Sequence, residues 1–269
     1  MFEIKDLDET RAPLLDHLIE LRTRIIRALL ALGVGFAVCL YFADEILGIL
    51  VQPLKNAFPE GKGQLIFTKL PEVFFVELKV ALFAGFMVSF PVIANQLWAF
   101  VAPGLYAREK KAFLPFLLAT PVLFTAGASL AYFVVMPVAF TFFLGFGGMT
   151  GGLDVQALPS AGDYLSLVMQ FILAFGLTFL LPVLLLLLHR AGIVSREQMV
   201  AARRYVIVGI FVIAAIVTPP DPGSQLVLAI PLWLLFEASL VLMRLQEKAV
   251  AADRAAREAE LAAEQAAAE

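Results

Sequence analysis

The sequence predicts an all-α, multi-pass membrane protein with six transmembrane helices and both chain ends in the cytoplasm. Hydrophobic residues make up 61% of the chain and charged residues only 16%, whereas soluble domains carry about 25% charged residues. A helix needs about 20 apolar residues to cross the hydrocarbon core. Most of six apolar runs reach or exceed that length: Ile25–Phe42, Val73–Trp98, Ala112–Phe143, Tyr164–Leu188, Tyr205–Val217 and Leu226–Met243.

The positive charges set the predicted orientation. Sixteen of the 20 lysines and arginines lie at or before the start of the first run, in alternate connections, or after the last run: Lys5, Arg11, Arg22, Arg24, Arg27, Arg108, Lys110, Lys111, Arg190, Arg196, Arg203, Arg204, Arg244, Lys248, Arg254 and Arg257. Cytoplasmic loops carry the excess of basic residues. Both termini are therefore predicted to be cytoplasmic.

Prolines within the apolar runs predict bent helices. Pro91, Pro115, Pro121, Pro182 and Pro231 each remove a backbone hydrogen bond and favour a kink. Kinked helices favour a cupped body with a concave surface. The last two runs are short and are joined by a proline-rich turn at 219–223, so we expect local bilayer thinning or polar groups at unusual depth.

The ends of the chain differ from its body. Apolar residues recur at helical spacing within 12–24, which predicts an amphipathic interfacial helix leading into the first span. We expect one membrane domain over residues 1–243. Residues 244–269 are rich in alanine and glutamate and predict a solvated, helical cytoplasmic tail.

Catalysis and metal binding have little support in the sequence. There is no phosphate-binding glycine loop, no HExxH and no pair of aspartates. The single cysteine, Cys39, lies in the first apolar run, and the two histidines, His17 and His189, are far apart. We therefore expect no enzyme activity, metal or cofactor. The net charge of -3 averages over separate compartments and does not indicate nucleic-acid binding.

Three polar segments stand out near the ends of the runs. HLIELR begins at His17, FVAPGLYARE covers residues 100–109, and TPPDPGSQ covers residues 218–225. Together and in this order they resemble the TatC family, the core subunit of the twin-arginine protein translocase. The resemblance runs from about residue 14 to residue 243.

The resemblance implies a function. Members of this family are six-span proteins of the bacterial inner membrane with both termini inside. They bind signal peptides that carry paired arginines and assemble into an oligomeric complex with the single-span subunits TatA and TatB. The complex exports folded proteins and is driven by the proton gradient. By motif, the signal-contacting acids of the family fall on Glu20 and Glu109, with Arg22 and Phe100 beside them.

The chemistry of a guanidinium fits this assignment. Carboxylates bind guanidinium through two parallel hydrogen bonds, a geometry that lysine cannot reproduce. Each acid also has a purely structural interpretation. Glu20 precedes Arg24 by four residues, the spacing of a local salt bridge, and Glu109 lies where a helix dipole favours a carboxylate.

The remaining candidates lie at or within the spans. Thr218, Asp221 and Gln225 at the last turn are predicted to dock partner subunits, or alternatively to hydrogen-bond between helices. Glu237 is predicted to need a partner or a water-filled cavity, and to face the concave side. Pro53 matches a family position whose alternative is an ordinary loop turn. Lys79 is an intramembrane charge.

One residue departs from the family pattern, and one other class of function stays open. Leu180 stands where the family commonly has an acid or glutamine, which puts a polar inner wall in doubt. Intramembrane Glu77, Lys79 and Glu237 favour the alternative of a small-solute transporter or channel. The absence of an internal repeat argues against that alternative.

Overall fold

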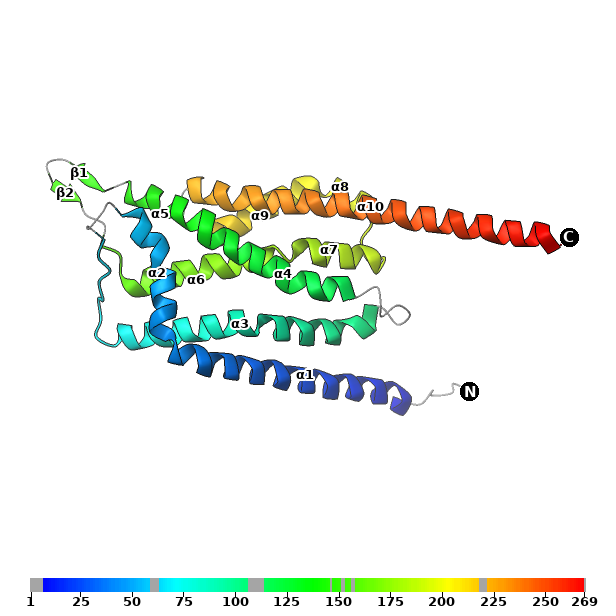
Figure 1. Ribbon diagram of the computed structural model, residues 1–269, viewed down its shortest axis with the longest axis horizontal. Helices are drawn as coiled ribbons and strands as arrows, with labels where there is room; N and C mark the ends of the chain where they lie inside the picture. Colours follow the sequence, from blue (N-terminus) through cyan, green and yellow to red (C-terminus); the bar gives the residue numbers. More distant parts are fainter. Residues whose placement is uncertain are drawn as a thin grey trace. The chain divides into compact units, whose positions relative to one another are not determined.

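The computed structural model describes residues 7–58, 63–105, 114–145, 147–150, 153–155, 158–217 and 222–268. Most of these residues are helical (Figure 1). Contacts divide the chain into two compact units, Met1–Gly176 and Leu177–Glu269. The prediction that a membrane domain ends at residue 243 stays a prediction, since the helix that contains this residue continues unbroken.

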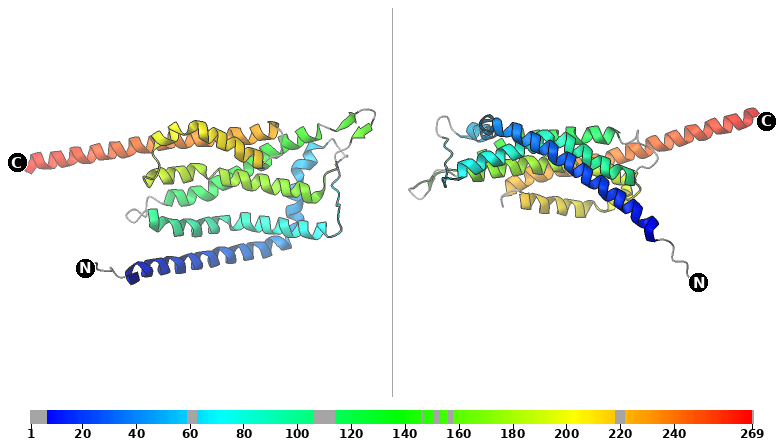
Figure 2. Two further views of the ribbon diagram at one scale, coloured as in Figure 1. Left: turned by 180° about the vertical axis from the view of Figure 1, so that it is seen from behind. Right: turned by 90° about the horizontal axis from the view of Figure 1, so that it is seen from below.

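Unit 1 contains most of the helices and one small hairpin. Its elements are α1 (Leu7–Tyr41), α2 (Ala43–Ala57), α3 (Glu72–Leu105), α4 (Leu114–Leu130), a π-helix (Ala131–Val135), α5 (Met136–Leu144), β1 (Gly148–Thr150), β2 (Leu153–Val155) and α6 (Ala161–Thr178). Helices α1 and α3 lie side by side along their length, and α2 runs across their end (Figures 1 and 2).

Unit 2 contains α7 (Leu181–Arg190), α8 (Arg196–Ala201), α9 (Arg203–Val217) and α10 (Pro222–Ala268). Helix α10 contacts α7, α8 and α9 and then extends well past them to the C-terminus (Figure 2). It has 47 residues. The prediction that the last two helices are both short is therefore confirmed for α9, with 15 residues, and wrong for α10.

Five stretches of helix are long and apolar enough to cross a membrane: His17–Tyr41, Glu72–Phe100, Phe116–Leu144, Ala161–Arg190 and Gln225–Ala249. They coincide with five of the six predicted spans. The fifth predicted span is α9, which at 1.5 Å per residue is about 22 Å long, shorter than the hydrocarbon core of about 30 Å. A multi-pass membrane protein is thus supported, whereas six spans and their orientation stay predictions.

Two local features depart from the sequence prediction. β1 and β2 pair as an antiparallel hairpin with Gly148 opposite Val155, so the chain is not strictly all-α. Pro182 does not sit within one continuous helix, because α6 ends at Thr178 and Pro182 occupies the first turn of α7. This position suits proline, whose missing N–H has no partner in a first turn. The kinks predicted at the other prolines stay predictions.

The π-helix has a cause in the sequence. It ends directly before α5, whose second residue is Pro137, and proline cannot donate the hydrogen bond that an α-helix needs at that point. A π-helical turn widens the helix by one residue and accommodates such a gap.

Small residues let α1 and α3 approach closely. A Cβ added at Gly85 would lie 2.6 Å from the backbone nitrogen of Phe36, and one added at Gly35 would lie 2.8 Å from the carbonyl oxygen of Gly85. One turn away, the hydroxyl of Ser89 donates to the carbonyl of Ala31 at 2.8 Å. Membrane helices associate through such small-residue contacts and hydrogen bonds, because lipid supplies no hydrophobic driving force.

Pro53 is a structural residue of α2 and not a loop turn. It is buried within the helix and lacks the N–H that would bond to the carbonyl of Ile49. The hydroxyl of Tyr132 donates to that carbonyl at 2.6 Å. The hydroxyl of Tyr164 donates to the next carbonyl, of Leu50, at 2.8 Å. Tyr132 therefore replaces the donor that the proline lacks, and both tyrosines fix α2 against the unit.

Glu72 ties the beginning of α3 to the beginning of α6. Its Oε2 accepts from the backbone N–H groups of Thr68 and Lys69 at 2.7 and 3.1 Å. Its Oε1 accepts from the hydroxyl of Ser160 at 2.6 Å and from the N–H of Gly162 at 2.9 Å. Hydrogen bonds to an ionised carboxylate are stronger than neutral ones. The clamp therefore sets the two helix starts at one level.

Candidate functional site

The predicted site lies where the first span begins and α3 ends. Helices α1 and α3 are antiparallel, and their contacts continue from the glycine crossing to this end with a regular register. Ser89 bonds to Ala31, and about two turns farther on Arg24 reaches Gln96. His17 meets Phe100 at the edge of the helix pair. The register that the small residues impose therefore positions these two pairs of side chains, Arg24 with Gln96 and His17 with Phe100.

Glu20 is held by a local salt bridge. Nη2 of Arg24 lies 3.0 Å from Oε1 of Glu20, and Nη1 of Arg24 donates to Oε1 of Gln96 at 3.4 Å. The local salt bridge to Arg24, which was the structural alternative for Glu20, is therefore present. The carboxylate is still 35% exposed, and its second oxygen has no partner among the residues that the structure describes.

Phe100 is half-buried and stacks on His17. The two ring centroids are 4.3 Å apart and the planes differ by 21°. The stacking fixes the start of HLIELR against the last turns of α3. Aromatic faces of this kind also attract guanidinium groups, and this pair lies one helical turn from Glu20, because His17 precedes Glu20 by three residues on α1.

The other two predicted residues of this site differ in how far they can be placed. Arg22 is exposed on α1 and forms no ion pair with any residue that the structure describes. Glu109 lies outside the described residues. The structure therefore places Glu20 and Phe100 at the same end of two neighbouring helices and leaves the second acid to be placed by experiment.

The residues predicted to dock partners belong to unit 2. Thr218 and Asp221 lie outside the described residues. The side-chain amide of Gln225 donates to the backbone carbonyl of Phe211 at 3.1 Å and so joins α10 to α9. An interhelical hydrogen bond was the structural alternative for Gln225, and its amide oxygen is left without a partner in the described part of the chain.

Glu237 has a cationic partner. Nη2 of Arg203, the first residue of α9, lies 2.8 Å from its Oε2, and the side chains are 48% and 27% exposed, respectively. The sequence predicts that the carboxylate of Glu237 needs either a partner or a water-filled cavity, and the structure shows a partner. Whether Glu237 faces a concave surface stays a prediction.

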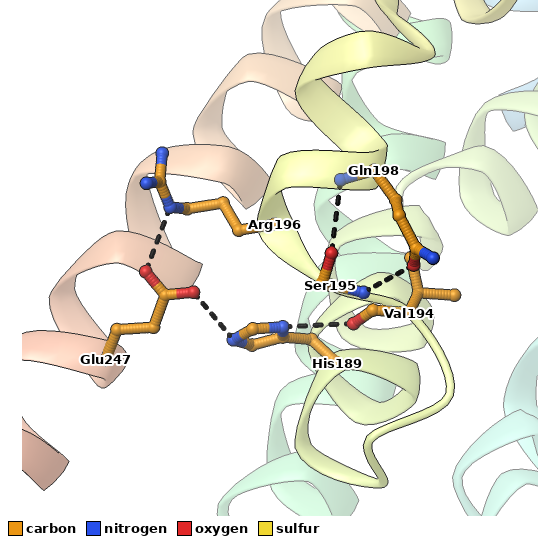
Figure 3. Close-up of polar contacts among 6 residues, drawn as sticks. All are labelled: His189, Val194, Ser195, Arg196, Gln198 and Glu247. Carbon is orange, nitrogen blue, oxygen red and sulfur yellow. Dashed lines mark hydrogen bonds and ion pairs between the residues drawn. The ribbon is translucent and has the colours of Figure 1, made fainter.

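A second polar cluster anchors α10 (Figure 3). Glu247 lies 2.9 Å from Nε of Arg196 and 3.5 Å from Nε2 of His189, while Nδ1 of His189 lies 3.1 Å from the carbonyl of Val194. Ser195 and Gln198 form a capping box that starts α8. The cluster fixes α10 to the turn between α7 and α8 just before α10 extends away, so we interpret it as structural.

Sequence reasoning missed three residues of these sites. Gln96 and the stacking role of His17 depend on the register between α1 and α3, which a single chain does not display. The sequence places Glu247 in the solvated tail, because its contact with His189 joins residues that are far apart in the chain. Arg24 was recognisable from its four-residue spacing to Glu20.

The family model and the sequence relatives that match this chain carry the same description. The family model described as "Sec-independent protein translocase protein (TatC)" matches residues 16–231. A relative of that name from Magnetococcus marinus is 49% identical over 257 residues, which cover 95% of this chain and 93% of the relative. The Escherichia coli relative is 40% identical over 236 residues, covering 88% and 90%.

Solved structures agree with the sequence relatives. A crystal structure described as the twin arginine translocase receptor TatC is 41% identical, with a TM-score of 0.74 and coverage of 85% of this chain and 98% of that one. A second crystal structure, described as the same receptor in the detergent DDM, is 42% identical with a TM-score of 0.75. These likenesses extend over nearly the whole of each solved chain.

Proposed function

The chain belongs to the TatC family of Sec-independent protein translocase proteins, and from this premise we propose that it is the receptor for twin-arginine signal peptides. In this proposal Glu20 and Glu109 bind the two guanidinium groups, with Arg22 and Phe100 beside them. The observation that carries it is the position of Glu20: a carboxylate that is 35% exposed, held by Arg24 and one helical turn along α1 from the His17–Phe100 stack.

The geometry supports guanidinium binding by preorganisation. Arg24 is anchored to Gln96, so it restricts the rotamers of Glu20 before any peptide arrives. Ordering a side chain in advance lowers the entropy cost of binding. The free oxygen of Glu20 is then available to an incoming N–H, and the ring of Phe100 is available to the face of the guanidinium.

Arg24 also weakens the attraction, because it neutralises part of the charge of Glu20. Charged hydrogen bonds are worth about 1.5–3 kcal/mol each, so a single acid that is already paired gives modest selectivity. A site with two acids can bind both arginines of a pair and is therefore more selective for such peptides. This favours Glu109 as the second contact.

The direct test is binding of a synthetic twin-arginine peptide to the purified chain in nanodiscs. We expect saturable binding and photo-crosslinking from a probe placed at Phe100, and at least tenfold weaker binding of a matched Lys-Lys peptide. Equal binding of the two peptides would refute the receptor proposal. A solute flux through liposomes that contain only this chain would favour a transporter instead.

The proposal extends to partner subunits and location. We place the chain in the bacterial inner membrane with both ends in the cytoplasm, in an oligomeric complex with TatA- and TatB-type single-span subunits. The complex exports folded proteins and uses the proton gradient. The excess of lysine and arginine in alternate connections supports the orientation. The turn between α9 and α10, with Thr218, Asp221 and Gln225, is the proposed docking face.

Replacing Thr218 or Gln225 by a large apolar residue is expected to disrupt crosslinking to a single-span subunit while peptide binding survives. The oxygen of Gln225 is open to a partner, and an interhelical hydrogen bond in a membrane is worth roughly 0.6–2 kcal/mol. Crosslinking yields for Gln225→Leu and Thr218→Leu in membranes measure the effect. Gln246→Leu makes the same change elsewhere on α10 and serves as the control. Native yields in both test variants would place the docking face elsewhere.

A further inference from the structure

A groove of about 740 Å³ in unit 1 is not part of the proposed signal-peptide site. Its walls are largely apolar and come from α1, α3 and α6, and they include Leu82, Phe83 and Phe86 on α3. Three polar side chains also line the groove: Lys79 on α3, and Ser166 and Gln170 on α6. All three are exposed.

These polar groups lie within one leaflet. The Glu72 clamp holds the starts of α3 and α6 at the same level, and both helices run from that end. At 1.5 Å per residue, Lys79 lies about 10 Å along α3 from Glu72. Ser166 and Gln170 lie about 6 and 12 Å along α6 from Gly162. The polar part of the groove is therefore confined to the leaflet in which α3 and α6 begin.

The cation and the amide are unsatisfied. Neither Lys79 nor Gln170 has a side-chain hydrogen bond or ion pair with any residue that the structure describes, while the hydroxyl of Ser166 donates to the carbonyl of Gly162 at 2.7 Å. Glu77 does not form an ion pair with Lys79, because side chains two residues apart on a helix point to different faces. A charge facing lipid is unfavourable without a partner or a route to the interface.

We propose that this groove binds an acidic phospholipid. The phosphate is held by the ammonium group of Lys79, whose long stem lets it reach toward the interface. The amide of Gln170 hydrogen-bonds the headgroup or the ester oxygens. An acyl chain lies along Leu82, Phe83 and Phe86, which continue deeper into the same leaflet.

The charge and the lining of the groove favour a lipid over a transmembrane helix of another protein. A lipid matches the order of the lining, with polar groups near the surface and apolar groups below. The single unpaired cation selects a negative headgroup.

The test is native mass spectrometry of the purified full chain, titrated with dioleoylphosphatidylglycerol or dioleoylphosphatidylcholine. We expect the first phosphatidylglycerol to bind at least tenfold more tightly than phosphatidylcholine, since one charged contact changes affinity about 10- to 100-fold. Lys79→Gln should abolish this preference and Lys79→Arg should keep it. Lys55→Gln removes an exposed cation of α2 and should leave the preference unchanged.

A further variant and a crosslinking experiment serve as controls. Gln170→Leu keeps the charge and should weaken phosphatidylglycerol binding by a smaller factor, and circular dichroism checks that each variant is folded. A photo-crosslinker at Leu82 in native membranes should label lipid. Equal binding of both lipids, an unchanged preference in Lys79→Gln, or crosslinking of Leu82 to a single-span protein would each overturn the proposal.

Discussion

Replacing Glu20 or Glu109 by alanine is expected to weaken binding of a twin-arginine signal peptide about 10- to 100-fold. Each change removes one charged hydrogen-bonding contact, worth about 1.5–3 kcal/mol, from the proposed site. Glu20→Gln should keep the shape of the side chain and lose most of the charge contribution. The measurement is the dissociation constant of a labelled peptide with the chain in nanodiscs.

A matched control separates this effect from a general change of charge. Glu45 on α2 is exposed and has no ion pair with the residues that the structure describes, so Glu45→Ala should bind peptide as the native chain does. High salt should also weaken binding, because exposed charges are screened. Native affinity in both Glu20→Ala and Glu109→Ala would remove the proposed site.

Replacing Gly85 by valine is expected to destabilise the pairing of α1 and α3 by about 3 kcal/mol or more. A Cβ at this position meets the backbone nitrogen and Cα of Phe36 at 2.6 and 2.8 Å. Backbone atoms cannot rotate away, so the helices must separate, and overpacking typically costs 1–3 kcal/mol even where side chains can move. Reversible unfolding in mixed micelles measures the loss.

The same substitution should also reduce peptide binding, since the crossing sets the register that brings His17 to Phe100 and Arg24 to Gln96. Gly33 provides the control, because a Cβ at Gly33 would meet no atom within 4 Å. Gly33→Val should therefore change stability by less than about 1 kcal/mol, an ordinary surface effect. Equal losses in the two variants would show that the crossing is not a tight contact.

Composition and periodicity determined the class of the protein. Apolar runs long enough to cross a bilayer have few other uses, because unpaired backbone groups in lipid must be satisfied within a helix. For the same reason the positions of five spans followed from the sequence, as did the short α9. The three polar segments were sufficient to indicate the family, which the comparisons bear out.

Local pairs with a fixed spacing were also within reach of the sequence. The four-residue step from Glu20 to Arg24 brings both side chains to one helix face, and the ion pair is present. The hairpin between α5 and α6 was missed, because a glycine-rich loop has no strong periodicity from which to predict strands. The tail was predicted to be helical, and the structure adds that it continues the last span as one helix, α10.

Contacts between distant segments were decided only by the tertiary structure. The Arg24–Gln96 bond, the His17–Phe100 stack, the Glu72 clamp and the Arg203–Glu237 ion pair all join residues far apart in the chain. Each depends on the relative register of two helices. That register is set by where small residues allow backbones to approach, as at Gly35 and Gly85, and a one-residue shift would turn each partner side chain about 100° away around its helix.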